Sequence, residues 1–402
     1  FKKNIISKTE FLTTIQYIFK MTKWFGIPTF GGKTALIWTV ILLLMTFAIE
    51  FGAIWKVVLA LTGMLTSATG NVTSQLSGAL FYGNALLSLL LTWRFVYQWK
   101  ELSLHWARVE NTPGIHFPPD ATLRRNVILI SAVVAVCALV EHIMSMIAAT
   151  GLECPIEEYF QRYILSSHGF LLHPKDYNLW FAVPIFIMSK ITTILWNFQD
   201  LVIILISMGL TSRYQRLNSY VKGVLQQATL DRDIGKVKFS RSWIDMYIEI
   251  QTWRKLREAY VQQASLVRRV DKTMGALVLL SNSNNFYFIC LQLFLIINKQ
   301  QGPLINKIYY AMSLVWLILR ACSVVLAAAD VNVHSQRALS ALIATPGLAY
   351  NVEIRRLENQ LTHDNVALGG MGYFSLYRQI LLEVAANIIK YELVLLQFDQ
   401  GK

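Results

Sequence analysis

Seven long apolar segments constrain the fold of this chain more than any other feature of its sequence. They cover roughly residues 34–58, 74–98, 126–150, 178–208, 273–298, 304–330 and 376–398. A helix needs about 20 apolar residues to cross the hydrocarbon core of a bilayer, and each segment is long enough. Only 15% of the residues are charged, whereas soluble domains carry about 25%. The sequence therefore predicts an all-α membrane protein with seven transmembrane helices.

The distribution of Lys and Arg predicts which way these helices run. Residues 1–33 and the connections after the second and fourth apolar segments are basic, whereas no Lys or Arg occurs from Val57 to Trp93. Cytosolic loops of membrane proteins carry the excess of positive charge. The N-terminus is therefore predicted to be cytosolic and the C-terminus extracellular. Asn71 begins the sequon Asn-Val-Thr in the first loop, so we expect it to be glycosylated on the outside.

The predicted division of the chain follows from this orientation. Trp243, Tyr247 and Trp253 recur at helical spacing in the long basic stretch after span four, which is more typical of packed helices than of a mobile linker. The predicted units are a cytosolic segment (1–33), spans one to four of a ligand-binding bundle (34–212), cytosolic helical extensions forming an anchor layer (213–272), spans five and six (273–330), a cytosolic connection (331–375), and span seven with an extracellular end (376–402).

Polar residues follow one face of the seventh segment. Glu383, Asn387, Lys390, Val394 and Gln397 are spaced four, three, four and three residues apart, which places them on one side of a helix. Charge inside a membrane is costly unless it faces water or a partner. Either several subunits enclose a water-filled ion path along this stripe, or neighbouring helices of one subunit satisfy it. Periodicity alone leaves both interpretations open.

A second set of polar and aromatic side chains is predicted in the outer half of the bundle. A carboxylate, amides and hydroxyls can replace water around the hydroxyls of a neutral sugar, and aromatic rings can stack on its C–H face. The alternative is a dry hydrogen-bonded network that holds the helices together. Asp200, Arg320 and Asp330 are expected nearer the cytosol, in structural ion pairs. The candidate ligand-binding residues are Tyr82, Glu141, His142, Ser145, Trp180, Asn285, Gln292, Tyr309, Tyr310 and Ser313.

Several function classes lack support in the sequence. There is no nucleophile elbow, no phosphate loop and no His/Cys spacing typical of a metal site, so no catalytic residue, metal or cofactor is predicted. The net charge of +13 could suit a nucleic-acid binder, but the basic residues lie in particular loops, which indicates membrane orientation instead.

The C-terminal residues Tyr391-Glu392-Leu393-Val394-Leu395-Leu396-Gln397-Phe398 resemble the signature of insect gustatory receptors, in which Tyr is followed after five residues by Gln-Phe. Further stretches are similar to the sugar-receptor clade of that family. They are Leu139–His142, Trp196–Asp200, Ser283–Cys290, Ala328–Asn332 and Val366–Gly369.

This resemblance implies a tetrameric, ligand-gated, non-selective cation channel of the plasma membrane. Its seventh helix would line a central pore, which favours the pore interpretation of the stripe. It places Gln397 and Phe398 at an extracellular gate, and Glu141 and Trp180 in a pocket open to the outside. The implied partners are a mono- or disaccharide, permeant cations, lipid, and further copies of the chain or related subunits. One departure matters: Lys390 stands where the family usually has Thr, and a lysine on a pore wall would repel cations.

Three other functions stay open. A gustatory channel for a non-sugar tastant is the nearest alternative. A seven-helix G-protein-coupled receptor would need an external N-terminus, and the chain lacks Asp-Arg-Tyr after span three and Asn-Pro-x-x-Tyr in span seven. A sugar transporter would carry labelled sugar without a gated current.

Overall fold

The described part of the chain is helical almost throughout. In the computed structural model this part comprises residues 10–27, 33–62, 72–111, 120–172, 174–233, 243–298, 303–345 and 350–400. An isolated antiparallel bridge joins Gly369 to Ser375. The helical elements are α2 (Glu10–Met21), η1 (Thr22–Phe25), α3 (Lys33–Leu61), α4 (Val72–Glu110), α5 (Ala121–Thr150), α6 (Ile156–Ser167), η3 (Pro174–Asp176), α7 (Leu179–Asp233), α8 (Trp243–Asn298), α9 (Leu304–Gln336), α10 (Leu339–Ile343), α11 (Val352–His363) and α12 (Ile380–Gln400).

Six helices within the described ranges are long and apolar enough to cross a membrane: α3, α4, α5, α7, α8 and α9. They coincide with the first six predicted segments, which confirms a multi-pass helical membrane fold. The 21 residues of α12 are also about the length that a span needs, although its residues 392–400 are described only as backbone. The total of seven crossings and the sides on which the two termini lie stay predictions.

The last helix begins later than the sequence predicted. The seventh apolar segment was expected from residue 376, but α12 starts at Ile380. The Leu376 N–H donates to the Leu368 carbonyl at 2.7 Å, and the Leu376 side chain is buried. Backbone pairing and burial therefore hold this residue in the preceding loop rather than in the helix.

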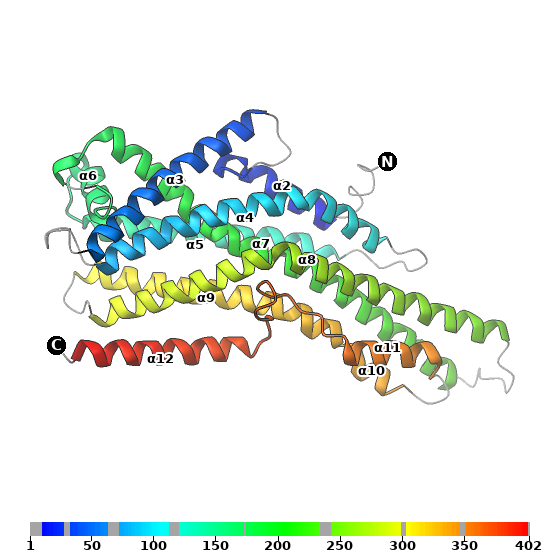
Figure 1. Cartoon of the computed structure of the whole chain (residues 1–402). Coiled ribbons are helices and arrows are strands. Elements are labelled where there is room, and N and C mark those ends of the chain that lie inside the picture. Colours follow the sequence, from blue (N-terminus) through cyan, green and yellow to red (C-terminus); the bar gives the residue numbers. More distant parts are fainter. Residues whose placement is uncertain are drawn as a thin grey trace.

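Helices α7 and α8 are far longer than a bilayer is thick. They contain 55 and 56 residues, about 80 Å at 1.5 Å per residue, whereas the hydrocarbon core measures about 30 Å. Figure 1 shows both helices continuing past the others to the end where α10 and α11 lie. In this extended region the buried Tyr214 of α7 packs on Tyr260 of α8 with ring centroids 6.2 Å apart. This region corresponds to the predicted anchor layer, whose cytosolic placement stays a prediction.

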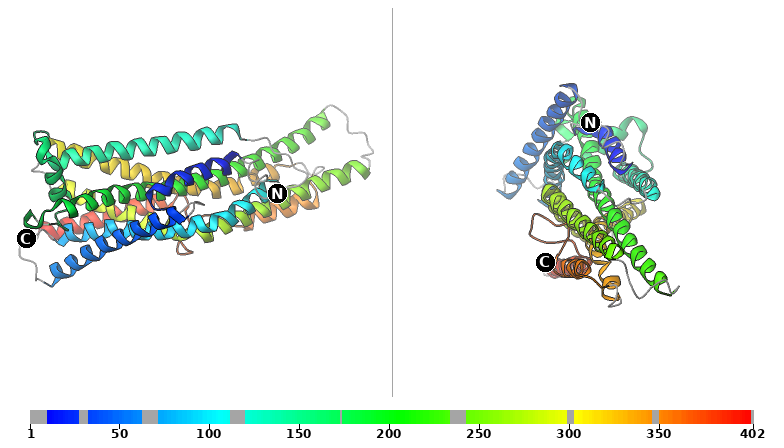
Figure 2. Two further views of the ribbon diagram at one scale, coloured as in Figure 1. Left: turned by 90° about the horizontal axis from the view of Figure 1, so that it is seen from above. Right: turned by 90° about the vertical axis from the view of Figure 1, so that its right-hand side faces the viewer.

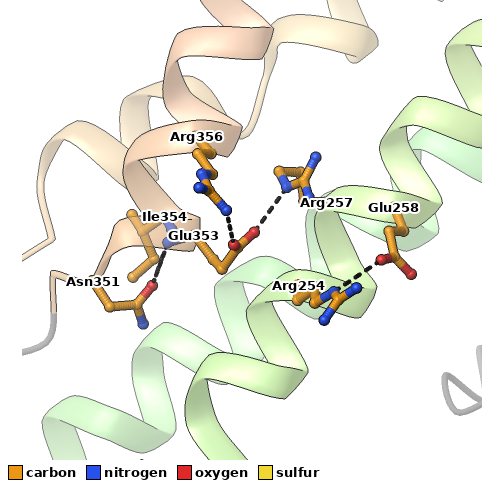
Figure 3. Close-up of polar contacts among 7 residues, drawn as sticks. All are labelled: Arg254, Arg257, Glu258, Asn351, Glu353, Ile354 and Arg356. Atoms are coloured by element: carbon orange, nitrogen blue, oxygen red, sulfur yellow. Dashed lines mark hydrogen bonds and ion pairs between the residues drawn. The ribbon is translucent and has the colours of Figure 1, made fainter.

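A buried carboxylate fastens α11 to α8. Asn351 caps α11 by accepting hydrogen bonds from two N–H groups of its first turn, both at 3.0 Å. The Glu353 carboxylate, in that same turn, pairs with Arg257 of α8 at 2.8 Å and with Arg356 at 2.6 Å (Figure 3). Hydrogen bonding to Arg257 first, and then to Arg356, lowers the pKa of Glu353 below its usual value although burial opposes this.

A second buried ion pair joins the membrane helices. Asp200 of α7 and Arg320 of α9 lie 2.8 Å apart, and their side chains are 1% and 3% exposed. The Ser281 hydroxyl of α8 donates to Asp200 at 2.5 Å, so three helices meet at this point. Asp330 pairs with Arg378 at 2.8 Å on the surface. The expectation of structural ion pairs at Asp200, Arg320 and Asp330 is therefore confirmed.

The outward faces of α3 and α5 carry large apolar side chains. Phe47, Phe51 and Trp55 of α3, and Leu129 and Val136 of α5, are exposed in the single chain. Figures 1 and 2 show both helices at the outside of the bundle. In a bilayer such a surface meets lipid, which removes it from water.

Candidate ligand-binding cavity

A cavity of about 500 Å³ lies among α4, α5, α6, α7, α8 and α9. Its wall combines hydroxyls, amides, a carboxylate and aromatic rings, a mixture that suits a neutral polar ligand. Seven predicted ligand-binding residues line it and are thus brought together by the fold: Glu141, His142, Ser145, Gln292, Tyr309, Tyr310 and Ser313.

Three residues of this wall already bond to one another. The Ser313 hydroxyl donates to Glu141 Oε1 at 2.5 Å, and Gln292 Nε2 donates to Ser313 Oγ at 3.0 Å. These residues come from α9, α5 and α8, so the bonds tie three helices together. The Gln292 Oε1 atom is buried and has no hydrogen-bond partner within the described part of the chain. The wall therefore contains a hydrogen-bonded network between helices, as in the alternative interpretation, and also an acceptor that a ligand could use.

Aromatic rings form another part of the wall. Trp196 of α7 and Phe288 of α8 have ring centroids 4.7 Å apart, and Phe81 of α4 lies 6.4 Å from Trp196. The Arg320 guanidinium lies over the Trp196 ring at 4.6 Å. The buried ion pair thus supports the cavity wall directly, since the cation and the ring attract one another.

The segment from α6 to the turn after it also lines the cavity, which sequence reasoning missed. It contributes Tyr163, Ser166, Ser167, His168 and Phe170. A Cβ atom at Gly78 of α4 would lie 2.4 Å from the Phe170 ring, so glycine is needed for this close approach. No periodic pattern marks such a segment. For Trp196 and Asn197 of α7, which also line the cavity, a signal did exist, because both begin a stretch that resembled the sugar-receptor clade.

Three predicted ligand-binding residues lie elsewhere. Trp180 is 85% exposed at the start of α7, a position typical of aromatic side chains at a membrane surface. Asn285 is buried, and its Nδ2 donates to Asp200 at 3.2 Å, so the ion-pair network occupies it. Tyr82 is fully buried behind the wall, against the rings of His168 and Phe170. The sequence shows that these three side chains are polar or aromatic, but not which neighbours each of them meets.

The predicted pore residues divide into two groups. Glu383, Asn387 and Lys390 are exposed on α12, and their side chains make no hydrogen bond or ion pair with other described residues. Val394, Gln397 and Phe398 belong to α12, but their side chains lie outside the described part, as does Asn71. Figures 1 and 2 show α12 at the edge of the bundle. The described half of the stripe is thus left uncovered by the rest of the chain.

Other sites offer less. An open pocket of about 590 Å³ at the α8–α11 contact is lined by charged and amide side chains, including Arg257 and Arg356, and these two arginines are already paired with Glu353. No group of His, Cys, Asp and Glu in the described ranges could hold a metal ion.

Comparisons with known proteins agree with this architecture. A family model described as "Trehalose receptor" matches residues 29–402. The chain is 31% identical over 342 residues to the Drosophila melanogaster gustatory receptor for sugar taste 64a, covering 82% of this chain and 71% of that relative. It is 29% identical over 321 residues to gustatory receptor 5a for trehalose of the same species, covering 78% and 68%. The solved structure of the insect olfactory receptor OR5 from Machilis hrabei superposes with a TM-score of 0.70 over 96% of this chain and 97% of that chain at 10% identity, which shows a shared fold.

Proposed function

This chain belongs to the trehalose receptor family, within the sugar-receptor clade of insect gustatory receptors, and we propose that it is a cation channel opened by extracellular sugar. The observation that carries the proposal is the cavity that gathers seven predicted ligand-binding residues. Relatives named for sugar taste and for trehalose support a sugar as the ligand. These relatives are receptors, which agrees with a role other than catalysis.

The wall has the chemistry to hold a sugar. Glu141 and Gln292 offer acceptors to hydroxyl groups, and Ser313 can exchange its present bonds for bonds to the ligand. Trp196 and Phe288 present rings that can stack on the apolar face of a pyranose. A neutral polyol therefore finds both kinds of contact in a single cavity.

Helix α8 is the element that can connect the cavity to α12. It places Phe288 and Gln292 in the cavity wall, and its Phe286 ring packs on Tyr391 of α12 with centroids 5.9 Å apart. A shift of α8 on sugar binding would therefore move α12. Only a ligand with different affinities for the closed and open states can shift the gate, and closure of the wall around the hydroxyls would supply that difference.

The exposed stripe of α12 supports assembly around a pore. Glu383, Asn387 and Lys390 would face lipid in a lone subunit, which is unfavourable for charged groups. Four copies of α12 around a central axis would give the stripe water instead. In this arrangement Gln397 and Phe398 form the outer gate, and cations pass when α12 moves away from the axis.

The test is to record currents from cells that express the full chain alone, with trehalose in the bath. Glu141→Gln removes a charged acceptor from the cavity, and we expect it to raise the half-maximal trehalose concentration about tenfold or more, since hydrogen bonds to charged groups contribute ~1.5–3 kcal/mol. Glu157→Gln, on the exposed first turn of α6, is the matched control and should change nothing.

Four results would each contradict one part of the proposal. Equal responses of the Glu141→Gln channel and the wild type would remove the cavity assignment. A pore that stays shut without ligand after Phe398→Ala would remove the gate assignment. Currents evoked by a non-sugar tastant but by no sugar would replace the ligand class. Uptake of labelled sugar without current would indicate a transporter.

A further inference from the structure

His168 lies at the α6 side of the cavity and has unused hydrogen-bonding capacity. It is only 5% exposed, it lines the cavity, and neither of its ring nitrogens has a hydrogen-bond partner within the described part of the chain. A buried polar group without a partner costs about 1–3 kcal/mol, and such groups in native proteins are rare. Gln292 Oε1 and Trp196 Nε1, elsewhere in the same wall, are unpaired as well. Several unpaired groups around one cavity indicate a ligand that completes them.

Backbone hydrogen bonds and aromatic neighbours hold His168 in place. It caps the C-terminus of α6, with its N–H donating to the Ile164 carbonyl at 2.8 Å and its own carbonyl accepting from the Leu171 N–H at 2.9 Å. The imidazole packs among the rings of Tyr82, Tyr163 and Phe170, with centroid distances of 6.3, 6.0 and 6.1 Å. The ring is thus held by packing alone, and its nitrogens are left free to bind.

Neighbouring elements hold this turn against the bundle. Lys190 of α7 donates to the Tyr163 hydroxyl at 2.8 Å and lies over the Tyr163 ring. Lys56 of α3 donates to the Leu171 carbonyl at 3.0 Å. Because these contacts come from α3 and α7, the α6 turn is part of the helical bundle, and a ligand bond to His168 would be felt by those helices.

The surroundings keep the imidazole of His168 uncharged. Burial first, and then the nearby Lys190 and His142, lower the pKa of His168 to about 3. The other titratable groups against this ring are the hydroxyls of Tyr82 and Tyr163. A neutral imidazole has one donor and one acceptor nitrogen, which matches a hydroxyl group. A cationic ligand group would be repelled here by Lys190.

We propose that His168 contacts the sugar directly and pairs with one hydroxyl at the α6 side of the cavity. This inference rests on the proposed function and extends it. The ligand spans from the Glu141–Ser313–Gln292 cluster on one side to the α6 turn on the other. His168 is then a residue that selects neutral hydroxyl-bearing ligands over charged ones.

The test compares His168→Phe with the wild type, using trehalose and its monodeoxy analogues as probes. Phenylalanine keeps the ring packing but cannot form hydrogen bonds. We expect the half-maximal trehalose concentration to rise about three- to tenfold, with unchanged maximal current. On the wild type, one monodeoxy analogue should need a half-maximal concentration higher than that of trehalose by a similar factor. On His168→Phe, this analogue and trehalose should have equal half-maximal concentrations, because the variant and the analogue each remove the same hydrogen bond. The matched control is His105→Phe, since His105 on the far part of α4 also has a buried unpaired nitrogen but does not line the cavity.

The outcomes separate this contact from the proposed function. If trehalose, maltose and glucose all fail to open the wild-type channel, the proposed function falls and the contact with it. If trehalose opens the wild type and His168→Phe responds at the same concentrations, the contact alone is refuted. The contact is also refuted if every monodeoxy analogue shows the same loss of affinity relative to trehalose on the wild type and on His168→Phe. Should His168→Phe fail to reach the cell surface, His168→Leu is read in the same way.

Discussion

The buried ion pair between Asp200 and Arg320 should dominate the stability of the membrane bundle. Arg320→Met removes the cation and leaves a carboxylate that is 1% exposed. Removing one partner of a buried pair costs about 3–5 kcal/mol. Arg320 also donates to Asn197 Oδ1 at 2.6 Å and lies over the Trp196 ring, so the upper part of this range is expected, together with a weaker sugar response.

The matched control is Arg378→Met. Arg378 and Asp330 are joined at the same distance of 2.8 Å, but their side chains are 59% and 38% exposed. Exposed pairs contribute only about 0.2–1 kcal/mol. Unfolding of the purified protein by SDS titration in mixed micelles measures both free energies of unfolding.

A third variant tests the physical cause. Asp200→Leu combined with Arg320→Met removes both charges, and replacing a buried pair by apolar side chains is often nearly neutral. We therefore expect the double variant to regain most of the stability that Arg320→Met loses. Equal losses for Arg320→Met and Arg378→Met, or a double variant less stable than Arg320→Met alone, would refute the argument from burial.

Four further predictions concern other parts of the chain. Glu353→Ala should destabilise the α8–α11 contact by about 1.5–3 kcal/mol, whereas Glu258→Ala, which breaks an exposed pair with Arg254 shown in Figure 3, should cost under ~0.5 kcal/mol; SDS titration measures both. The pKa of Glu353 is lowered in the folded protein. The ionised Glu353 therefore contributes fully to the free energy of unfolding above its usual pKa near 4.5, and this contribution is lost as pH falls through the folded-state pKa. If Glu353 is the cause, the free energy of unfolding of Glu353→Ala should lack this pH dependence. Gly78→Ala should displace Phe170 and weaken the trehalose response, while Gly223→Ala on α7, whose added Cβ meets nothing within 4 Å, should stabilise the helix by up to ~1 kcal/mol; equal effects would contradict the packing argument. Lys390→Thr should raise single-channel cation conductance, and an unchanged conductance would place Lys390 away from the pore.

The sequence predicted much of the architecture. Apolar segments are long enough to be read directly, and six of them became helices of the expected position. The ion pairs of Asp200, Arg320 and Asp330 were also anticipated, because charged groups within a membrane protein need partners. The start of α12 was missed by four residues, since the apolar Leu376 that opened the predicted segment is buried in the preceding loop, where its N–H donates to the Leu368 carbonyl.

The cavity was predicted only in part. Glu141, Gln292 and Ser313 were expected in the cavity, and they do contact one another there. Trp180 was expected in the wall but is exposed, and Trp196 is the tryptophan that lines the cavity instead. Both tryptophans belong to α7, and nothing in the spacing of one helix says which of its residues lies at the depth of the cavity.

What the sequence by itself determined is therefore the set of long apolar helices and, for some of them, the face that carries polar groups, because hydrophobic length and periodicity are local properties. The tertiary structure alone decided which faces meet and that the α6 turn closes the cavity. Both features depend on the rotation and depth of each helix against its neighbours. Packing between segments distant in the sequence sets this rotation and depth. Examples are the close approach of Phe170 to Gly78 and the hydrogen bond from Lys190 to the Tyr163 hydroxyl.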